Sequence, residues 1–205
     1  MGPPETEVPS RVTATLQGAA TSSPPGTSRD EDLALARAAA LGDRRAFETI
    51  VARHGPALTR YALRATPDRG EAEDLVQDAL VAAWQSLDRF DGRSALRTWL
   101  FGILVHKVQS SRRRRKAVPV TDEVLDRPDD ADPVQAASDL ELRDALEAAL
   151  RALPERQRSV WVLVEVEGLS QAEVAEVLHT TPDTVRGQLF RARRALAEGM
   201  KEWRA

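Results

Sequence analysis

Apolar residues recur at intervals of three and four along most of the chain after Asp30, and this spacing places them on one face of an α-helix. The pattern is clearest between Leu75 and Leu87. The apolar residues there are Leu75, Val76, Ala79, Leu80, Ala83, Trp84 and Leu87. No segment alternates apolar and polar residues in the manner of a half-buried strand. The pattern therefore predicts an all-α protein.

Helix boundary signals divide the first half of the chain into four predicted helices. Ser28 and Glu31 have the spacing of a capping box, so the first helix is predicted to begin there. A second helix is expected over about 46–65. The third follows a cap at residues 66–68, and the fourth is predicted to start at Ser94 and to continue into a run of arginines.

Prolines among acidic residues interrupt the helical pattern in the middle of the chain. Residues 117–137 neither continue a helix nor present an apolar face, so they are predicted to form a flexible acidic linker, which could mimic nucleic acid. Residues 1–28 are rich in Pro, Ser, Thr and Gly and are predicted to be a disordered tail. The chain is thus predicted to hold two small helical domains, at residues 29–116 and 138–205.

The second domain carries the pattern of a helix-turn-helix. A helix expected over about 154–168 precedes it. Ser170 and Glu173 form a capping box for a short helix, a turn follows at residues 179–180, and Thr181 caps the next helix. The outward face of that last helix carries Arg186, Gln188, Arg191 and Arg193, which suit base edges and phosphates in a major groove. An ordinary helical hairpin with solvated arginines is the alternative.

The charges of the chain are segregated although their sum is small. There are 29 Lys and Arg against 32 Asp and Glu, which gives a net charge of −3. Between Arg89 and Lys116 the one acidic residue is Asp91, whereas residues 122–144 hold nine acidic residues against two arginines. Two basic segments therefore flank an acidic one, and the basic segments favour a nucleic-acid partner.

Several classes of protein are excluded by what the chain lacks. It has no cysteine, so it has neither a disulfide nor a thiolate zinc site. No apolar run reaches the roughly 18 residues that a membrane span requires. The N-terminal segment lacks the basic and apolar stretches of a secretion signal. We therefore expect a cytoplasmic protein with no cofactor, no metal and no membrane insertion.

Two segments carry a resemblance to a known family. Residues 150–196, LRALPERQRSVWVLVEVEGLSQAEVAEVLHTTPDTVRGQLFRARRAL, closely resemble the fourth domain of extracytoplasmic-function (ECF) sigma factors of the sigma-70 family. Residues 72–108, AEDLVQDALVAAWQSLDRFDGRSALRTWLFGILVHKV, resemble their second domain. The resemblance implies a promoter-recognition subunit without catalytic activity. It also implies three partners: core RNA polymerase, promoter DNA and an anti-sigma factor.

One acidic helix face is assigned to polymerase binding by this resemblance. Asp74, Gln77 and Asp78 would dock on the clamp helices of the largest polymerase subunit, and the flap of the second-largest subunit is the other expected contact. Helical spacing puts Asp74 and Asp78 one turn apart on one face. A merely solvated acidic face is one alternative. A magnesium site for nuclease chemistry that includes Glu71 is another, although further ligands and a nearby base are missing.

The resemblance also assigns the loop at residues 90–94 and the helix after it to the −10 promoter element, where a base flipped out of the non-template strand would be held. Unpairing a base costs a few kcal/mol, and stacking can offset about 1 to 3 kcal/mol per base. Phe90 and Trp99 offer stacking surface, although Trp99 suits a core position equally well. The predicted −10 contacts are Phe90, Arg93, Ser94, Arg97, Trp99, His106, Lys107, Arg112, Arg113, Arg114 and Arg115.

The helix-turn-helix is assigned to the −35 element in the same way. The predicted −35 contacts are Thr181, Asp183, Thr184, Arg186, Gly187, Gln188, Phe190, Arg191 and Arg193. Three residues depart from the family pattern: His106 stands where an Asn is common, His179 where Gly or Asp is frequent, and Gly187 where a Ser is common. Glycine inside a helix costs about 0.5 to 1 kcal/mol relative to alanine, so Gly187 suggests a close backbone approach to DNA. A helix-turn-helix regulator that is not a sigma subunit remains the alternative.

Overall fold

The computed structural model describes residues 29–117 and 136–201, and all of its regular structure in these two stretches is helical. The all-α prediction is therefore confirmed for them. The predicted N-terminal tail, its capping residue Ser28 and nearly all of the predicted linker lie outside the described residues. No helix in the described stretches is long and apolar enough to cross a membrane.

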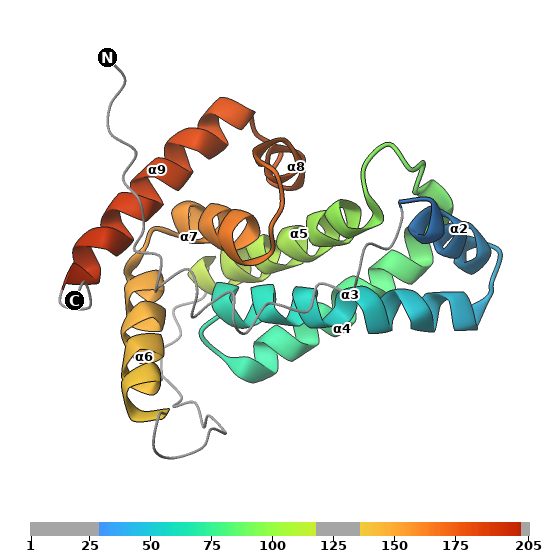
Figure 1. The fold of residues 1–205 in the computed structure, drawn as a ribbon. Coiled ribbons are helices and arrows are strands. Elements are labelled where there is room, and N and C mark those ends of the chain that lie inside the picture. Colours follow the sequence, from blue (N-terminus) through green and yellow to red (C-terminus); the bar gives the residue numbers. More distant parts are fainter. Residues whose placement is uncertain (1–28, 118–135, 202–205) are drawn as a thin grey trace.

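The first stretch forms an N-terminal unit of four α-helices and a short 3-10 turn. Its elements are α2 (Arg29–Ala40), α3 (Arg44–Ala65), α4 (Arg69–Ser86), η1 (Leu87–Arg89) and α5 (Leu96–Ala117). Helix α3 packs against α2 and α4, and α5 packs against α3 and α4 (Figure 1). Leu58, Tyr61, Phe101 and Leu104 lie in the core between them.

Side-chain caps fix where two of these helices begin. Asp43 accepts hydrogen bonds from the backbone N–H groups of Arg45 and Ala46, so α3 starts slightly before the predicted residue 46. Asp68 accepts from the N–H of Glu71 and starts α4, as its position in the predicted cap indicated. In both cases a carboxylate satisfies N–H groups that have no partner inside the helix.

The predicted start of the fourth helix at Ser94 was wrong by two residues, because α5 begins at Leu96. The residues before it form a loop instead. The carboxylate of Asp91 accepts the backbone N–H of Arg93 at 3.0 Å, a local bond that replaces a helical turn.

The second stretch forms a C-terminal unit. Its elements are α6 (Ala136–Ala152), α7 (Glu155–Trp161), a π-helical turn η2 (Val162–Val166), α8 (Gln171–Val177) and α9 (Pro182–Gly199). The helix predicted over 154–168 is thus α7 followed by η2, and Gly168 leaves it with a φ of +69°. The predicted inward face of α9 is confirmed, since Val185, Leu189, Ala192 and Leu196 are all buried.

The two units pack against each other in this structure. Helix α3 contacts α6, α7 and η2, and α5 contacts α8 (Figure 1). The sequence predicted two domains joined by a linker and indicated no surface between them. The contact therefore adds an interface that lies beside the basic helix α5.

Candidate nucleic-acid interface

The loop that follows η1 is held in place by helix α2. The guanidinium of Arg29 donates hydrogen bonds to the backbone oxygens of Gly92 and Arg93, at 2.8 and 2.5 Å. Gly92 has a φ of +73°, and a Cβ atom there would lie 2.9 Å from Cδ1 of Leu33. The positive φ is what favours glycine here, since Cδ1 is the end of a flexible side chain that can turn away from a Cβ atom. No local pattern connects Arg29 or Leu33 with this loop, because both lie far from it along the chain.

Several predicted −10 residues surround one cavity next to this loop. The cavity has a volume of about 430 Å³, within the range of about 300 to 1,000 Å³ that small ligands occupy. The predicted −10 residues that line it are Ser94, Trp99, His106 and Lys107. Residues of the C-terminal unit line it as well. A cavity of this kind is what a flipped base requires.

The two aromatic residues of the predicted −10 surface contact each other. The rings of Phe90 and Trp99 have centroids 5.3 Å apart and planes inclined by 49°. Both side chains are half-buried and pack against the core. Trp99 therefore packs against the core and also keeps an exposed part. Its predicted roles in stacking on a base and in core packing are compatible.

The basic run at the end of α5 is partly neutralised by carboxylates of the same chain. Arg115 pairs with Glu71 at 2.6 Å, and Arg112 pairs with Glu155 at 2.8 Å. Arg113 and Arg114 are exposed. The sequence indicated that an anion must compensate this like-charge run, and the structure places two carboxylates there. The run therefore offers Arg113 and Arg114 to a further anion without breaking an ion pair.

Arg97 does not face solvent as an unpaired phosphate contact would. Its guanidinium donates to the carboxylate of Glu167 at 3.0 Å and lies 5.5 Å from the centre of the Phe101 ring. Arg93, by contrast, extends from the loop, with 91% of its side chain exposed and an ion pair to Asp91 at 3.0 Å. Of these two predicted −10 arginines, Arg93 is the more accessible in this arrangement, because 32% of the Arg97 side chain is exposed.

The helix-turn-helix is formed by α8 and α9. Ser170 and Glu173 make the predicted capping box, and Thr181 caps α9 through the N–H of Thr184. His179, in the turn, has a φ of +49°, a region that favours the Gly or Asp expected there. The exposed members of the predicted −35 set are Thr181, Asp183, Thr184, Arg186, Phe190 and Arg191.

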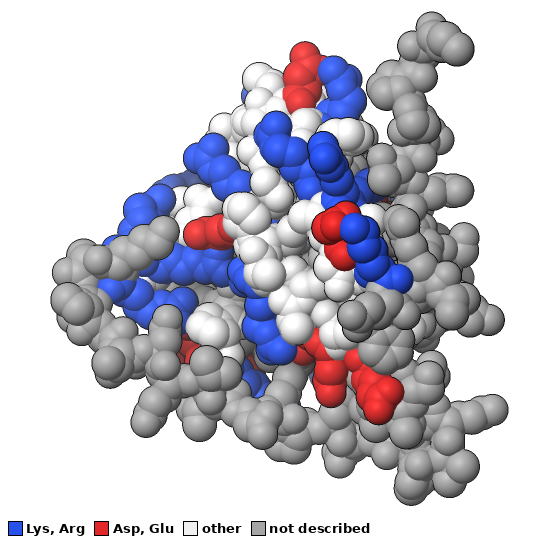
Figure 2. Space-filling model, turned by 90° about the vertical axis from the view of Figure 1, so that its left-hand side faces the viewer, with Lys and Arg blue, Asp and Glu red and all other residues white. Residues whose placement is uncertain are grey.

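The remaining members of the −35 set are half-buried, and one of them has a partner. The guanidinium of Arg193 donates two hydrogen bonds to Glu165, at 2.9 and 2.6 Å. A Cβ atom on Gly187 would meet the guanidinium of Arg191 at 3.7 Å, which is an ordinary contact. The packing of the protein itself therefore does not demand glycine at position 187. On the face where α9 and α6 lie, Lys and Arg side chains outnumber Asp and Glu (Figure 2).

The acidic face of α4 is open to a partner. Asp74, Gln77 and Asp78 are all exposed, and Asp78 lies 3.8 Å from the ammonium group of Lys107. The carboxylate of Glu71 is turned toward α5, where it pairs with Arg115, so it does not join this face. Across the part of the chain that the structure describes, no three His, Asp or Glu side chains are grouped as metal ligands.

Glu173 is an acidic residue with two roles that the sequence revealed only in part. Burial raises its pKa, but hydrogen bonds from the side chain and backbone of Ser170 and from Thr98 outweigh this, so the pKa lies below its usual value of 4.5. The bond from Thr98 crosses from α5 to α8 at 3.0 Å. The capping-box spacing identified the first role, whereas nothing in the sequence indicated the second.

We expect Ser170→Ala to lower the free energy of unfolding of the C-terminal unit by about 1 kcal/mol, because the cap of α8 is lost. Glu173 has a lowered pKa in the folded state, so its contribution is complete above the unfolded pKa and is lost as the pH falls through the folded pKa. The difference in unfolding free energy between variant and wild type should therefore be largest near neutral pH and should shrink below pH 4.5. Urea unfolding followed by circular dichroism at several pH values measures it, and a difference that grows on acidification would contradict the assignment.

Comparison with known proteins places this geometry in a family. Residues 50–118 match the Sigma-70 region 2 family, and residues 143–196 match the Sigma-70, region 4 family. The chain is 31% identical to the RNA polymerase sigma-H factor of Pseudomonas aeruginosa, over 84% of this chain and 95% of that protein. It is 31% identical to the ECF RNA polymerase sigma-E factor of Escherichia coli, over 76% and 86%. The chain belongs to the ECF RNA polymerase sigma factors.

Solved structures agree with this membership. One reports CnrH in complex with the cytosolic domain of CnrY; it is 35% identical, covers 84% of this sigma factor and 98% of that chain, and has a TM-score of 0.65. Another reports the sigma factor RpoE with the anti-sigma factor NepR from Bartonella quintana, at 28% identity, 76% and 96% coverage and a TM-score of 0.64. The N-terminal unit is accordingly called region 2 below, and the C-terminal unit region 4.

Proposed function

We propose that this sigma factor binds core RNA polymerase and directs initiation at promoters by contacting a −10 element with region 2 and a −35 element with region 4, without catalysing a reaction itself. The observation that carries the proposal is that each of the two family domains carries exposed arginines among its predicted DNA contacts. They are Arg93, Arg113 and Arg114 in region 2, and Arg186 and Arg191 in region 4. We place its action in the cytoplasm, where the chromosomal template lies. The domains proposed for these roles span residues 29–116 and 138–205.

Region 2 is proposed to hold a base of the melted −10 element on its own wall of the cavity beside the loop, once region 4 has moved away. Ser94, Trp99 and His106 would contact the base, and Lys107 would neutralise a phosphate. Stacking on an aromatic surface supplies about 1 to 3 kcal/mol per base, which offsets the few kcal/mol that unpairing costs. The exposed side chains of Arg93, Arg113 and Arg114 would hold the backbone of the strand on either side.

Region 4 is proposed to place the N-terminal half of α9 in the major groove at the −35 element. A helix fits this groove, and arginine reads guanine there with two hydrogen bonds. Arg186 is the strongest candidate for base recognition. Its side chain is 69% exposed, and it forms an ion pair at 2.9 Å with the still more exposed Asp183, which a base edge can replace.

We expect Arg186→Ala to weaken binding to promoter duplex by about 1 to 3 kcal/mol, because a bidentate base contact is lost. Fluorescence anisotropy with promoter and random duplexes at one salt concentration measures this change. Arg194→Ala is the matched control, since Arg194 is exposed on the same helix but lies outside the proposed −35 set. Equal losses on promoter and random DNA for Arg186→Ala would refute the base contact.

An anti-sigma partner is proposed as well. The similar structures of CnrH and RpoE each hold a second protein, which is the anti-sigma factor NepR in the RpoE complex. Such a partner would act by covering surfaces that polymerase or DNA requires. Mapping of transcript start sites after overexpression tests the whole proposal: new starts should share one −10 and one −35 sequence, and starts without shared elements would refute it.

A further inference from the structure

The carboxylate of Glu167 lies at the boundary between regions 2 and 4 and is fully buried. Arg60 donates to both of its oxygens, at 3.3 and 3.0 Å, and Arg97 donates to one of them at 3.0 Å. Both arginines belong to region 2, on α3 and α5, whereas Glu167 follows η2 in region 4. Since a charge is buried only where partners compensate it, this ion pair depends on the two regions staying together.

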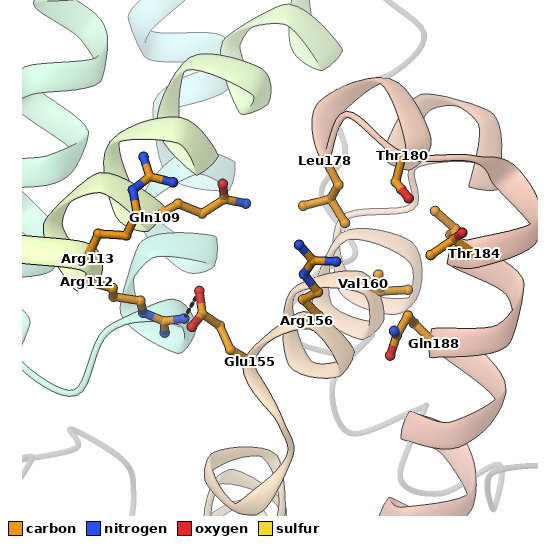
Figure 3. Close-up of a pocket in the computed structure, with 11 residues that line it drawn as sticks. Gln109, Arg112, Arg113, Glu155, Arg156, Val160, Leu178, Thr180, Thr184 and Gln188 are labelled. Atoms are coloured by element: carbon orange, nitrogen blue, oxygen red, sulfur yellow. Dashed lines mark ion pairs between the residues drawn. The ribbon is translucent and has the colours of Figure 1, made fainter. Parts of the chain in front are cut away.

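Further polar contacts cross the same boundary. They are Tyr61 to Ser159 at 3.2 Å, Thr98 to Glu173 at 3.0 Å and Arg112 to Glu155 at 2.8 Å. Figure 3 shows the last of these contacts as a dashed line between α5 and the start of α7. In each of the ion pairs named here, the acid comes from region 4 and the base from region 2. Region 4 therefore presents carboxylates to region 2 where DNA would present phosphates.

The side chains held in this way belong to the proposed −10 surface. Arg97 and Arg112 are members of that set, and in this arrangement both are paired with carboxylates of region 4. The cavity proposed for the flipped base is also affected, because α8 closes one side of it. The residues of α8 and its turn that line this cavity are Glu176, Val177 and His179.

The proposed −35 surface on α9 is in turn partly covered by α5 of region 2. Thr184 and Gln188 of α9 line a cavity of about 240 Å³ together with Arg112 and Arg113 of α5 (Figure 3). A helix that reads bases must enter a major groove about 12 Å wide with DNA on both sides of it. Because α5 lies across from Thr184 and Gln188, these two side chains cannot reach a duplex in this arrangement.

We propose that the free sigma factor is closed on itself: the acidic side chains Glu155, Glu167 and Glu173 of region 4 occupy the −10 surface of region 2, and DNA competes with them. The competition rests on the −10 assignment proposed above, whereas the closure does not. The attraction within a buried ion pair is largely offset by the cost of removing its charges from water, so the pair adds little net stability. The regions can therefore separate when polymerase or DNA offers equivalent partners. Removal of one partner of the pair, by contrast, leaves the other charge uncompensated and favours separation of the two regions.

The test measures closure and DNA binding in the full-length chain separately. Because the protein has no cysteine, Glu48→Cys and Ala195→Cys provide two unique labelling sites, at exposed positions of α3 and α9. Energy transfer between dyes at these sites reports the distance between the regions. Anisotropy of a labelled single-stranded DNA of mixed sequence reports access to the basic surface of region 2. Both are measured at fixed salt, without polymerase.

Glu167→Gln should lower the energy transfer and tighten binding to the single strand by at least about threefold, because the competent open state becomes more populated. Glu165→Gln is the matched control: it removes the same charge two residues away, but Glu165 pairs with Arg193 inside region 4, so energy transfer should stay unchanged and any gain in affinity should be smaller. Arg60→Gln, from the other side of the ion pair and outside the proposed DNA set, should lower the energy transfer even if Glu167→Gln fails to fold.

Each outcome has a definite meaning for the proposal. Unchanged energy transfer in folded Glu167→Gln and in Arg60→Gln would overturn the closure. Opening without a gain in affinity over the Glu165→Gln control would overturn the competition with DNA. A chain that opens as expected but does not direct initiation would contradict the proposed function and leave the closure standing.

Discussion

The double substitution Asp74→Ala with Asp78→Ala is expected to weaken binding to core RNA polymerase by roughly 100-fold. Hydrogen bonds to charged groups contribute about 1.5 to 3 kcal/mol each, so a combined loss of about 3 kcal/mol is expected for two partly additive contacts. Both carboxylates are exposed on one face of α4, and Asp78 lies 3.8 Å from the ammonium group of Lys107. Binding to immobilised or labelled core polymerase measures the effect.

Glu73→Ala is the control for this prediction. Glu73 is an exposed acid on the same helix, but it lies beside the proposed face and pairs with Arg69 at 2.8 Å. Removing it should change polymerase binding by less than about threefold, since exposed ion pairs contribute less than about 1 kcal/mol. If Glu73→Ala weakens binding as much as the double variant does, the contact depends on general acidity and not on the proposed face.

Phe101→Ala is expected to lower the free energy of unfolding of region 2 by about 3 to 5 kcal/mol. The side chain of Phe101 is completely buried in α5 and stacks edge-on against Tyr61, with ring centroids 5.9 Å apart. Its removal leaves a cavity beneath the proposed −10 surface and withdraws the ring on which the guanidinium of Arg97 rests. Because a domain is stable by only about 5 to 15 kcal/mol, region 2 should be close to its folding limit.

Phe190→Ala offers the same chemical change at an exposed site. Phe190 is 50% exposed on α9, so its loss should cost no more than about 1 kcal/mol. Urea unfolding followed by circular dichroism compares the two variants. Similar midpoints for Phe101→Ala and Phe190→Ala would contradict the assignment of Phe101 to the core.

The helices could be predicted from the sequence because their signals are local. The spacing of Leu75, Val76 and Ala79 identified the buried face of α4, and the Ser170 capping box identified the start of α8. The helix-turn-helix was recognised in the same way, from two caps and a short first helix. Such patterns reflect contacts within one or two turns, so they need no knowledge of the rest of the fold.

The partners of the basic residues could not be predicted, because they are distant in sequence. The sequence placed Arg97 among the DNA contacts, and nothing local connects it with Glu167, 70 residues further on. Glu165 and Glu167 interrupt the apolar run VLVEVEG, and carboxylates in such a run need cationic partners. The pattern shows that partners are needed but not which residues supply them.

The same limit applies to the loop of the proposed −10 surface. Asp91 and Gly92 marked a turn, but its orientation is set by Arg29 and Leu33 on α2. A turn signal specifies local backbone geometry alone. The position of the loop, and therefore of the cavity beside it, follows from packing between elements that the sequence pattern does not connect.

Reconstituted transcription is the most direct test of the central claim that this chain is a sigma subunit with two DNA-binding surfaces. Core RNA polymerase free of other sigma factors is mixed with the chain and with a template whose promoter comes from the mapped start sites. The account predicts transcripts that begin at one defined nucleotide and are absent without the chain. Transcripts that appear only after another sigma factor is added would identify a helix-turn-helix regulator and contradict the account.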